Sequence, residues 1–179
     1  MEQNHRLMQS KSSLLENPES YRRLVGRLIY LCFTRPDLSY CVHVLSQFMQ
    51  NPRVEHWQAA LRVARYLKGN PGQGILLRSE CDLQLYGLFD SDWASCPLTR
   101  RSLTGWFVLL GNSLISWKTK KQHTVSRSSP EAEYRSMAMT VCELKWLKGL
   151  LLDLGVMHTT PIRLYCDSQA ALHMAKNSV

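Results

Sequence analysis

The sequence lacks any long hydrophobic run and any sign of a secretory leader. No uninterrupted apolar stretch approaches the roughly 18 to 20 residues that a membrane-spanning helix needs. The first five residues, Met-Glu-Gln-Asn-His, are too polar and too acidic for a signal peptide. We therefore expect an intracellular protein, cytoplasmic or nuclear, that is not secreted and does not enter a membrane.

Cysteine pairs at metal-binding spacing are also missing. The six cysteines include no C-x-x-C pair and no other zinc-ligand spacing, which excludes the common structural zinc sites. We expect reduced thiols with a structural role. These cysteines lie at positions 32, 41, 81, 96, 142 and 166.

Acidic residues are fewer than basic ones, since 14 Asp and Glu stand against 22 Lys and Arg, for a net charge of +8. This excess weakly favours an anionic partner such as nucleic acid. Neither half holds it alone, because residues 1–80 contain 11 basic and 6 acidic residues and residues 81–179 contain 11 and 8. A chain of 179 residues that is 45% hydrophobic can bury a core, as one large domain or two small ones.

Residues 19–69 follow the helical period. Apolar residues recur at helical spacing until Thr34, Arg35 and Pro36 interrupt them. Pro36 suits the first turn of a second helix, which ends before Asn51 and Pro52. A third helix is predicted over 53–68, and its apolar stripe comprises Trp57, Ala60, Leu61, Ala64 and Leu67. Residues 1–72 are therefore predicted to form a small helical segment.

From residue 73 the pattern becomes that of an α/β domain. Short segments rich in β-formers cover 75–78, 83–90, 104–110 and 113–117, and Gly111-Asn112 resembles a tight hairpin turn. A long helix is predicted over 130–154, then a strand over 162–166 and a helix over 169–176. The buried stripe of the long helix is expected to comprise Met137, Val141, Leu144, Leu147 and Leu151. This order predicts a mixed sheet with flanking helices in residues 73–179.

Three acidic residues stand where a predicted strand ends or a helix begins, which is where α/β folds assemble their sites. Asp90 and Asp167 end strands, and Glu133 lies in the first turns of the long helix. With no Cys or His among them, these carboxylates are hard oxygen ligands suited to Mg²⁺ or Mn²⁺. The alternative for each aspartate is a turn former or helix cap, and for the glutamate a partner of the helix dipole.

The long helix offers two glutamates near its start. Pro130 fits the first helical position with Ser129 as the cap, so Glu131 faces the helix dipole. Glu133 lies four residues before Met137, on the stripe that faces the sheet. We therefore expect Glu133 to be the inward ligand.

Six sequence blocks follow one another along most of the chain. They are YRRLVGRLIYL (21–31), TRPDLSYCVHVLSQFM (34–49), HWQAALRVARYLKG (56–69), GLFDSDWAS (87–95), SSPEAEYRSMA (128–138) and LYCDSQAAL (164–172). In this order the blocks closely resemble the end of a copia-type retrotransposon Pol polyprotein. The first three resemble the trailing, thumb-like part of its reverse transcriptase, and the last three resemble its ribonuclease H domain. No adjacent Asp-Asp pair occurs, so DNA synthesis is not expected.

The resemblance implies a ribonuclease H-like fold and hydrolysis of the RNA strand of an RNA–DNA hybrid with two Mg²⁺ or Mn²⁺ ions. By position, it carries three of the family's catalytic, metal-binding carboxylates onto Asp90, Glu133 and Asp167. The family's fourth carboxylate follows a further segment, and none of the 12 residues after Asp167 is acidic. We therefore expect a ribonuclease H-like domain that is incomplete at its C-terminus. The alternative is a catalytically inactive remnant that at most binds nucleic acid.

Basic residues before the long helix could lie along the phosphates of a hybrid, because phosphate contacts supply most non-specific affinity. The alternative is a solvated loop. The nucleic-acid-binding candidates are Lys118, Lys120, Lys121 and Arg127, together with Arg100 and Arg101 in the turn after the predicted 83–90 strand.

Overall fold

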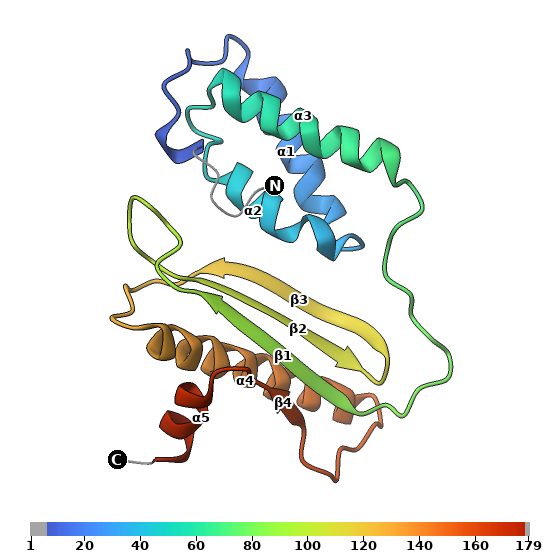
Figure 1. The fold of residues 1–179 in the computed structure, drawn as a ribbon. Helices are drawn as coiled ribbons and strands as arrows, with labels where there is room; N and C mark the ends of the chain where they lie inside the picture. Colours follow the sequence, from blue (N-terminus) through green and yellow to red (C-terminus); the bar gives the residue numbers. More distant parts are fainter. Residues whose placement is uncertain (1–6, 178–179) are drawn as a thin grey trace. The chain divides into compact units, whose positions relative to one another are not determined.

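The structure is a computed structural model that describes residues 7–177. Its chain contacts divide it into two compact units, Met1–Ile75 and Leu76–Val179, and each is described by itself. Figure 1 follows the chain from the helical first unit to the sheet of the second. None of the helices in residues 7–177 combines the length and the apolar composition that crossing a bilayer would need.

The first unit contains the three predicted helices. They are α1 (Pro18–Leu31), α2 (Ser39–Ser46) and α3 (Val54–Gly69), with short 3-10 turns at Leu7–Gln9 and Pro36–Leu38. Asn17 caps α1, because its side chain accepts a hydrogen bond from the Ser20 N–H, and Pro18 occupies the first turn. Tyr21 is fully buried, and its hydroxyl donates to the Leu45 carbonyl at 2.7 Å, which joins α1 to α2.

The buried face of α3 is displaced from the predicted stripe. Ala60 is buried as expected, but Trp57 is only half-buried and His56 beside it is 3% exposed. The His56 ring stacks on Phe48 with centroids 3.8 Å apart, and its Nδ1 accepts from the Arg53 N–H. A histidine whose ring nitrogens are bonded can therefore replace an apolar residue in this core.

The second unit is an α/β structure built on a mixed four-stranded sheet. Strands β1 (Leu85–Asp92), β2 (Leu103–Leu110) and β3 (Ser113–Lys121) form antiparallel neighbours, and β4 (Arg163–Tyr165) pairs with β1 in parallel. The order across the sheet is β3-β2-β1-β4. Helix α4 (Ser129–Asp153) packs on the sheet, and α5 (Gln169–Lys176) lies against α4. The predicted α/β class with flanking helices is thus confirmed.

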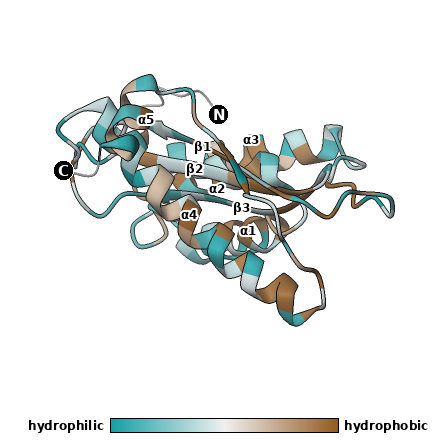
Figure 2. Ribbon diagram, turned by 90° about the horizontal axis from the view of Figure 1, so that it is seen from below, coloured by the Kyte–Doolittle hydropathy of each residue, from teal (hydrophilic) through white to brown (hydrophobic). Residues whose placement is uncertain are grey.

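Helix α4 meets the sheet through Leu144, Leu147 and Leu151, which pack with Phe89 and Trp106. The last turns of α4 are strongly hydrophobic (Figure 2). Gly87 lets the two layers approach closely, since a Cβ there would lie 2.8 Å from Leu144 Cδ1.

Three local predictions are wrong. Residues 75–78 form no strand, because no neighbouring strand pairs with them. Val141 is 38% exposed, and the buried line of α4 passes instead through Ser136 and Thr140. These polar residues fit because the Ser136 hydroxyl bonds to Thr104 at 2.8 Å and the Thr140 hydroxyl donates to the Ser136 carbonyl. Strand β3 also continues to Lys121, beyond the predicted end at residue 117.

Candidate metal centre

One end of the second unit's sheet collects the chemically active side chains. The parallel strands β1 and β4 both end there, β3 ends there, and α4 begins there. Asp90 lies near the end of β1, which runs two residues further than predicted, and Asp167 follows β4. Glu133 lies in the first turns of α4, whose cap is Ser128, one residue earlier than predicted. Three elements separated in sequence therefore deliver one carboxylate each.

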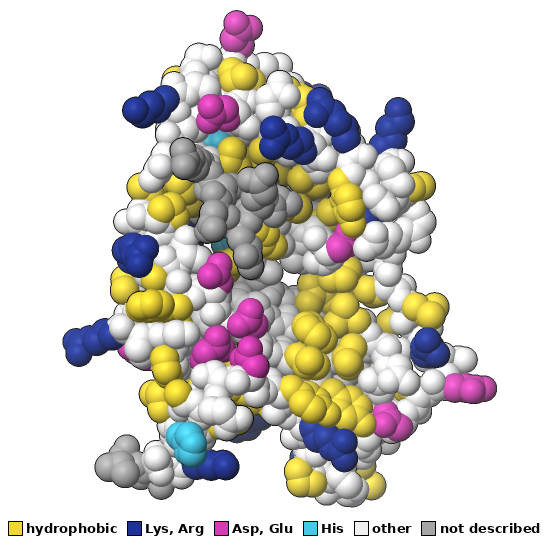
Figure 3. Space-filling view, viewed as in Figure 1, with side chains coloured by type: hydrophobic (Ala, Val, Ile, Leu, Met, Phe, Trp, Pro, Cys, Tyr) yellow, Lys and Arg dark blue, Asp and Glu magenta, His cyan; other side chains and the backbone are white. Residues whose placement is uncertain are grey.

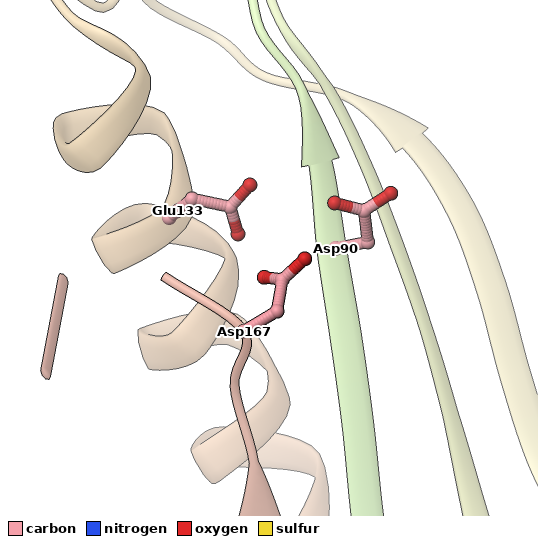
Figure 4. Close-up of side chains that lie close together, drawn as sticks. All are labelled: Asp90, Glu133 and Asp167. Carbon is pink, nitrogen blue, oxygen red and sulfur yellow. The ribbon is translucent and has the colours of Figure 1, made fainter. Parts of the chain in front are cut away.

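The carboxylates of Asp90, Glu133 and Asp167 converge. Each offers an oxygen that lies within 4.8 Å of those of the other two. Figure 4 shows the three side chains pointing toward one another from β1, α4 and the segment after β4. Acidic side chains also gather on the molecular face seen in Figure 3. Asp90 and Asp167 are exposed, whereas Glu133 is buried, so the cluster has a buried floor and an open side.

A single backbone amide lies between two of the carboxylates. The Ser91 N–H donates to Asp90 Oδ1 at 2.7 Å and to Glu133 Oε1 at 3.1 Å. The other oxygen of Glu133, Oε2, is buried and has no hydrogen-bond partner in the described part of the chain. A buried carboxylate oxygen without a partner is costly, so the cluster lacks one hydrogen-bond donor or cation at Glu133 Oε2.

The electrostatics of the cluster favour an added positive charge. Burial first, and then the charges of Asp90 and Asp167, together raise the pKa of Glu133 to about 7, against the lowering effect of the Ser91 amide. Burial and the charge of Asp90 also raise the pKa of Asp92, at the end of β1. A divalent cation would relieve this repulsion and give Glu133 Oε2 a partner. The residues present therefore fit a hard cation held by oxygen ligands.

The neighbouring acidic residue on α4 lies outside the cluster. Glu131 accepts from the Arg127 N–H at 2.8 Å and pairs with Arg135 at 2.9 Å. These bonds lower the pKa of Glu131. Helix α4 thus separates an outward, ion-paired glutamate from the inward Glu133.

The predicted basic candidates lie on three segments at this end of the sheet. Lys118, Lys120 and Lys121 belong to β3 itself and not to a loop, because the strand continues through them. Lys118 is exposed, but Lys121 is half-buried and its Nζ lies 3.3 Å from Cys96 Sγ. The remaining candidates are exposed in the loops on either side, namely Arg100, Arg101 and Arg127.

Sequence reasoning missed two residues that shape the cluster. Ser91 acts through its backbone amide, and any residue type except proline supplies one. Gln122 is buried directly after β3 and bonds to three surrounding elements. The sequence does place a glutamine, Gln122, between a strand and the helix that supplies Glu133. Nothing in the neighbouring residues marks this side chain as buried.

The fold and the cluster define an α/β unit with a three-carboxylate group that could hold a metal ion. The chain is 48% identical over 165 residues to the "Retrovirus-related Pol polyprotein from transposon RE2" of Arabidopsis thaliana, which is 92% of this chain. It is 38% identical over 173 residues, or 96% of the chain, to the "Retrovirus-related Pol polyprotein from transposon TNT 1-94" of Nicotiana tabacum. The chain belongs to the copia-type retrotransposon Pol family.

The chain spans only a small part of these relatives, 11% of the first polyprotein and 13% of the second. It covers 90% of a shorter relative, the "Secreted RxLR effector protein 161" of Plasmopara viticola, at 41% identity over 128 residues, or 71% of this chain. No family model matches the chain, and no solved structure matches it significantly.

Proposed function

We propose that the second unit is a ribonuclease H-like domain that acts on the RNA strand of an RNA–DNA hybrid. The single observation that carries this proposal is the convergence of Asp90, Glu133 and Asp167 around a buried, unpartnered Glu133 oxygen. Membership of the Pol family and the sheet order β3-β2-β1-β4, with β4 parallel to β1, both support it. In the same proposal, the first unit is the thumb-like part of the reverse transcriptase.

The three carboxylates would hold Mg²⁺ or Mn²⁺, which supplies an activated water and stabilises the leaving oxygen in phosphodiester hydrolysis. Asp90 and Asp167 are exposed and would hold the ion from the open side of the cluster. Glu133 would add its buried Oε2, which has no hydrogen-bond partner in the described residues. The Ser91 amide keeps Asp90 and Glu133 oriented, since it donates to both.

A hybrid would approach along the end of the sheet that carries the basic candidates. Exposed Lys118 and Arg127, with Arg100 and Arg101 across the β1–β2 loop, offer phosphate contacts around the acidic cluster. Such contacts position a duplex without reading its sequence. The proposed substrate is therefore recognised by its backbone, and cleavage is expected at many sequences.

Two measurements on the 179-residue chain test the proposal. Titration calorimetry with Mn²⁺ should detect binding that Asp90→Asn weakens at least tenfold, because the amide keeps one oxygen but loses the negative charge that attracts the cation. The labelled RNA strand of a hybrid should then be cut in Mn²⁺ by the original chain and not by the Asp90→Asn variant. Glu131→Gln is the matched control, since Glu131 lies outside the cluster.

The possible results distinguish a metal-dependent enzyme from a protein that only binds nucleic acid. A chain that binds no Mn²⁺ refutes the metal centre. A chain that binds Mn²⁺ and hybrid but leaves the RNA strand intact at every Mn²⁺ concentration refutes the enzymatic activity and leaves a nucleic-acid-binding protein. Cleavage that persists in Asp90→Asn would assign the activity to a contaminant.

A further inference from the structure

Gln122 is the centre of a buried polar network beneath the carboxylate cluster. Its side chain is almost completely buried, and its Nε2 donates to the Ala132 carbonyl at 3.0 Å and to Thr104 Oγ1 at 3.1 Å. Its Oε1 accepts from the Ser126 hydroxyl at 3.0 Å. Both N–H groups of the amide thus donate and its carbonyl oxygen accepts one bond, so both polar atoms of the buried side chain are satisfied.

The partners of Gln122 are the sequence neighbours of the carboxylates. Ala132 directly precedes Glu133 on α4. Gln122 Nε2 also lies 3.5 Å from Ser91 Oγ, and Ser91 directly follows Asp90 on β1. The Ser91 N–H in turn donates to both carboxylates. One side-chain amide therefore contacts both elements whose spacing sets the distance between Asp90 and Glu133.

The position of Gln122 is itself held. Its backbone N–H donates to the Ser102 carbonyl at 2.9 Å, and the Ser102 hydroxyl accepts from the Ala94 N–H at 3.0 Å. Thr104, which accepts from Gln122, is bonded to Ser136 on α4 at 2.8 Å. A buried, directional hydrogen-bond network fixes the spacing of the elements that it joins, because each bond has a preferred length and angle.

We propose that Gln122 is the positioning residue of the carboxylate site, which holds the first turn of α4 against the end of β1 so that Asp90 and Glu133 share one cation. It acts through Ala132 and Ser91 and touches neither the ion nor the substrate. This inference rests on the proposed function of the cluster as a metal centre. Residues that support metal ligands in this way commonly change metal affinity by 10 to 100-fold when they are replaced.

The test compares Gln122→Met with Thr140→Val. Methionine fills a similar volume without the amide, and Thr140 is a fully buried residue of α4 whose hydroxyl donates to the Ser136 carbonyl of the same helix. Hydrogen exchange of the Ser91 amide in metal-free protein reports the local geometry, and calorimetry with Mn²⁺ reports the site. We expect Gln122→Met to accelerate Ser91 exchange several-fold and to weaken Mn²⁺ binding about tenfold, with neither change in Thr140→Val.

The outcomes distinguish this inference from the proposed function. Ser91 exchange or Mn²⁺ affinity in Gln122→Met that matches Thr140→Val overturns the positioning role. If Ser91 exchange accelerates but the unmodified chain binds no Mn²⁺, the metal centre fails while the structural link from Gln122 to the carboxylates is supported. If Gln122→Met does not fold, Gln122→Asn replaces it. Its amide is too short to reach Ala132 and Ser126 together, so an unchanged Ser91 exchange in that variant overturns the inference.

Discussion

Ionisation of Glu133 should destabilise the second unit, and Glu133→Gln should remove that penalty. Raising the pKa of this carboxyl from 4.5 to about 7 corresponds to an upper value of about 3 kcal/mol. Because Asp90 and Asp167 are exposed, water screens part of the repulsion, and we expect about 1 to 3 kcal/mol. The folded state binds this proton more tightly than the unfolded state. Its stabilising effect is therefore fully present below pH 4.5 and is lost as the pH rises through 7.

The assay is urea unfolding in EDTA at pH 5 and pH 8, followed through the amides of β1 so that only the second unit is reported. Glu133→Gln should match the original chain at pH 5 and exceed it at pH 8. Glu131→Gln, two residues away, should instead lower the stability of the second unit at pH 8. Arg127 and Arg135 lower the pKa of Glu131, so the folded state favours its charged carboxylate, which the variant lacks.

Adding Mn²⁺ at pH 8 should make the original chain more stable against urea than Glu133→Gln. The reason is that the ion stabilises only the chain that keeps all three carboxylates. Equal stability of Glu133→Gln and the original chain at both pH values would refute the claim that Glu133 is ionised at a cost. A Glu133→Gln variant that gains stability from Mn²⁺ as strongly as the original chain would refute its role as a ligand.

Three further predictions concern other parts of the chain. Replacing Lys118 and Lys120 with Ala should weaken hybrid binding and flatten its salt dependence in a fluorescence titration, whereas Lys121→Ala should change the slope less because Lys121 contacts Cys96. The first unit should lose stability as the pH falls below 6.5, since burial lowers the pKa of His56 and the unfolded state then binds the extra proton; thermal unfolding at pH 7.5 and 5.5 measures this. Gly111→Ala should destabilise the second unit by about 1 to 3 kcal/mol in urea, because φ is +54° and a Cβ would lie 2.7 Å from the Cβ of Cys81.

Each of these has a control. Gly105→Ala, in open space on β2, should cost less than Gly111→Ala, and equal losses would contradict the strain argument. A His56→Gln variant should lack most of the pH dependence of the first unit, and an unchanged dependence would assign it to another group. An equal loss of salt slope from Lys121→Ala would contradict its pairing with Cys96.

The sequence was sufficient to predict those parts of the fold that depend on local periodicity. The helices at Pro18–Leu31 and Gln169–Lys176 and the hairpin at Gly111 follow from apolar spacing and turn chemistry. The strand predicted at 75–78 failed because strand formation requires a pairing partner, which a local window does not contain. Val141 was misplaced because the periodicity counted apolar residues, whereas the buried line of α4 includes Ser136 and Thr140.

The candidate site divides in the same way. Asp90, Glu133 and Asp167 could be proposed from their positions at strand ends and a helix start, and from the family resemblance. The distance between their oxygens could not, because it depends on how α4 packs against β1. The roles of Ser91 and Gln122 could not be predicted for a related reason. Ser91 contributes a backbone amide, and Gln122 contributes bonds to residues 10 or more positions away in sequence.

The shortness of β4 affects how long the third carboxylate stays in place. This edge strand contributes only three residues to the sheet, Arg163–Tyr165, and Asp167 follows two residues later. A short edge strand opens more readily than the strands beside it, so Asp167 should leave and rejoin the cluster on the timescale of local unfolding. An ion bound to all three carboxylates would stabilise the closed form of this edge. The free energy of opening β4 would rise by about 2.7 kcal/mol at an ion concentration 100 times the dissociation constant. Hydrogen exchange of the β4 amides would then report how much of the protein holds the ion. It should be slow when the ion is bound and fast when the ion has left.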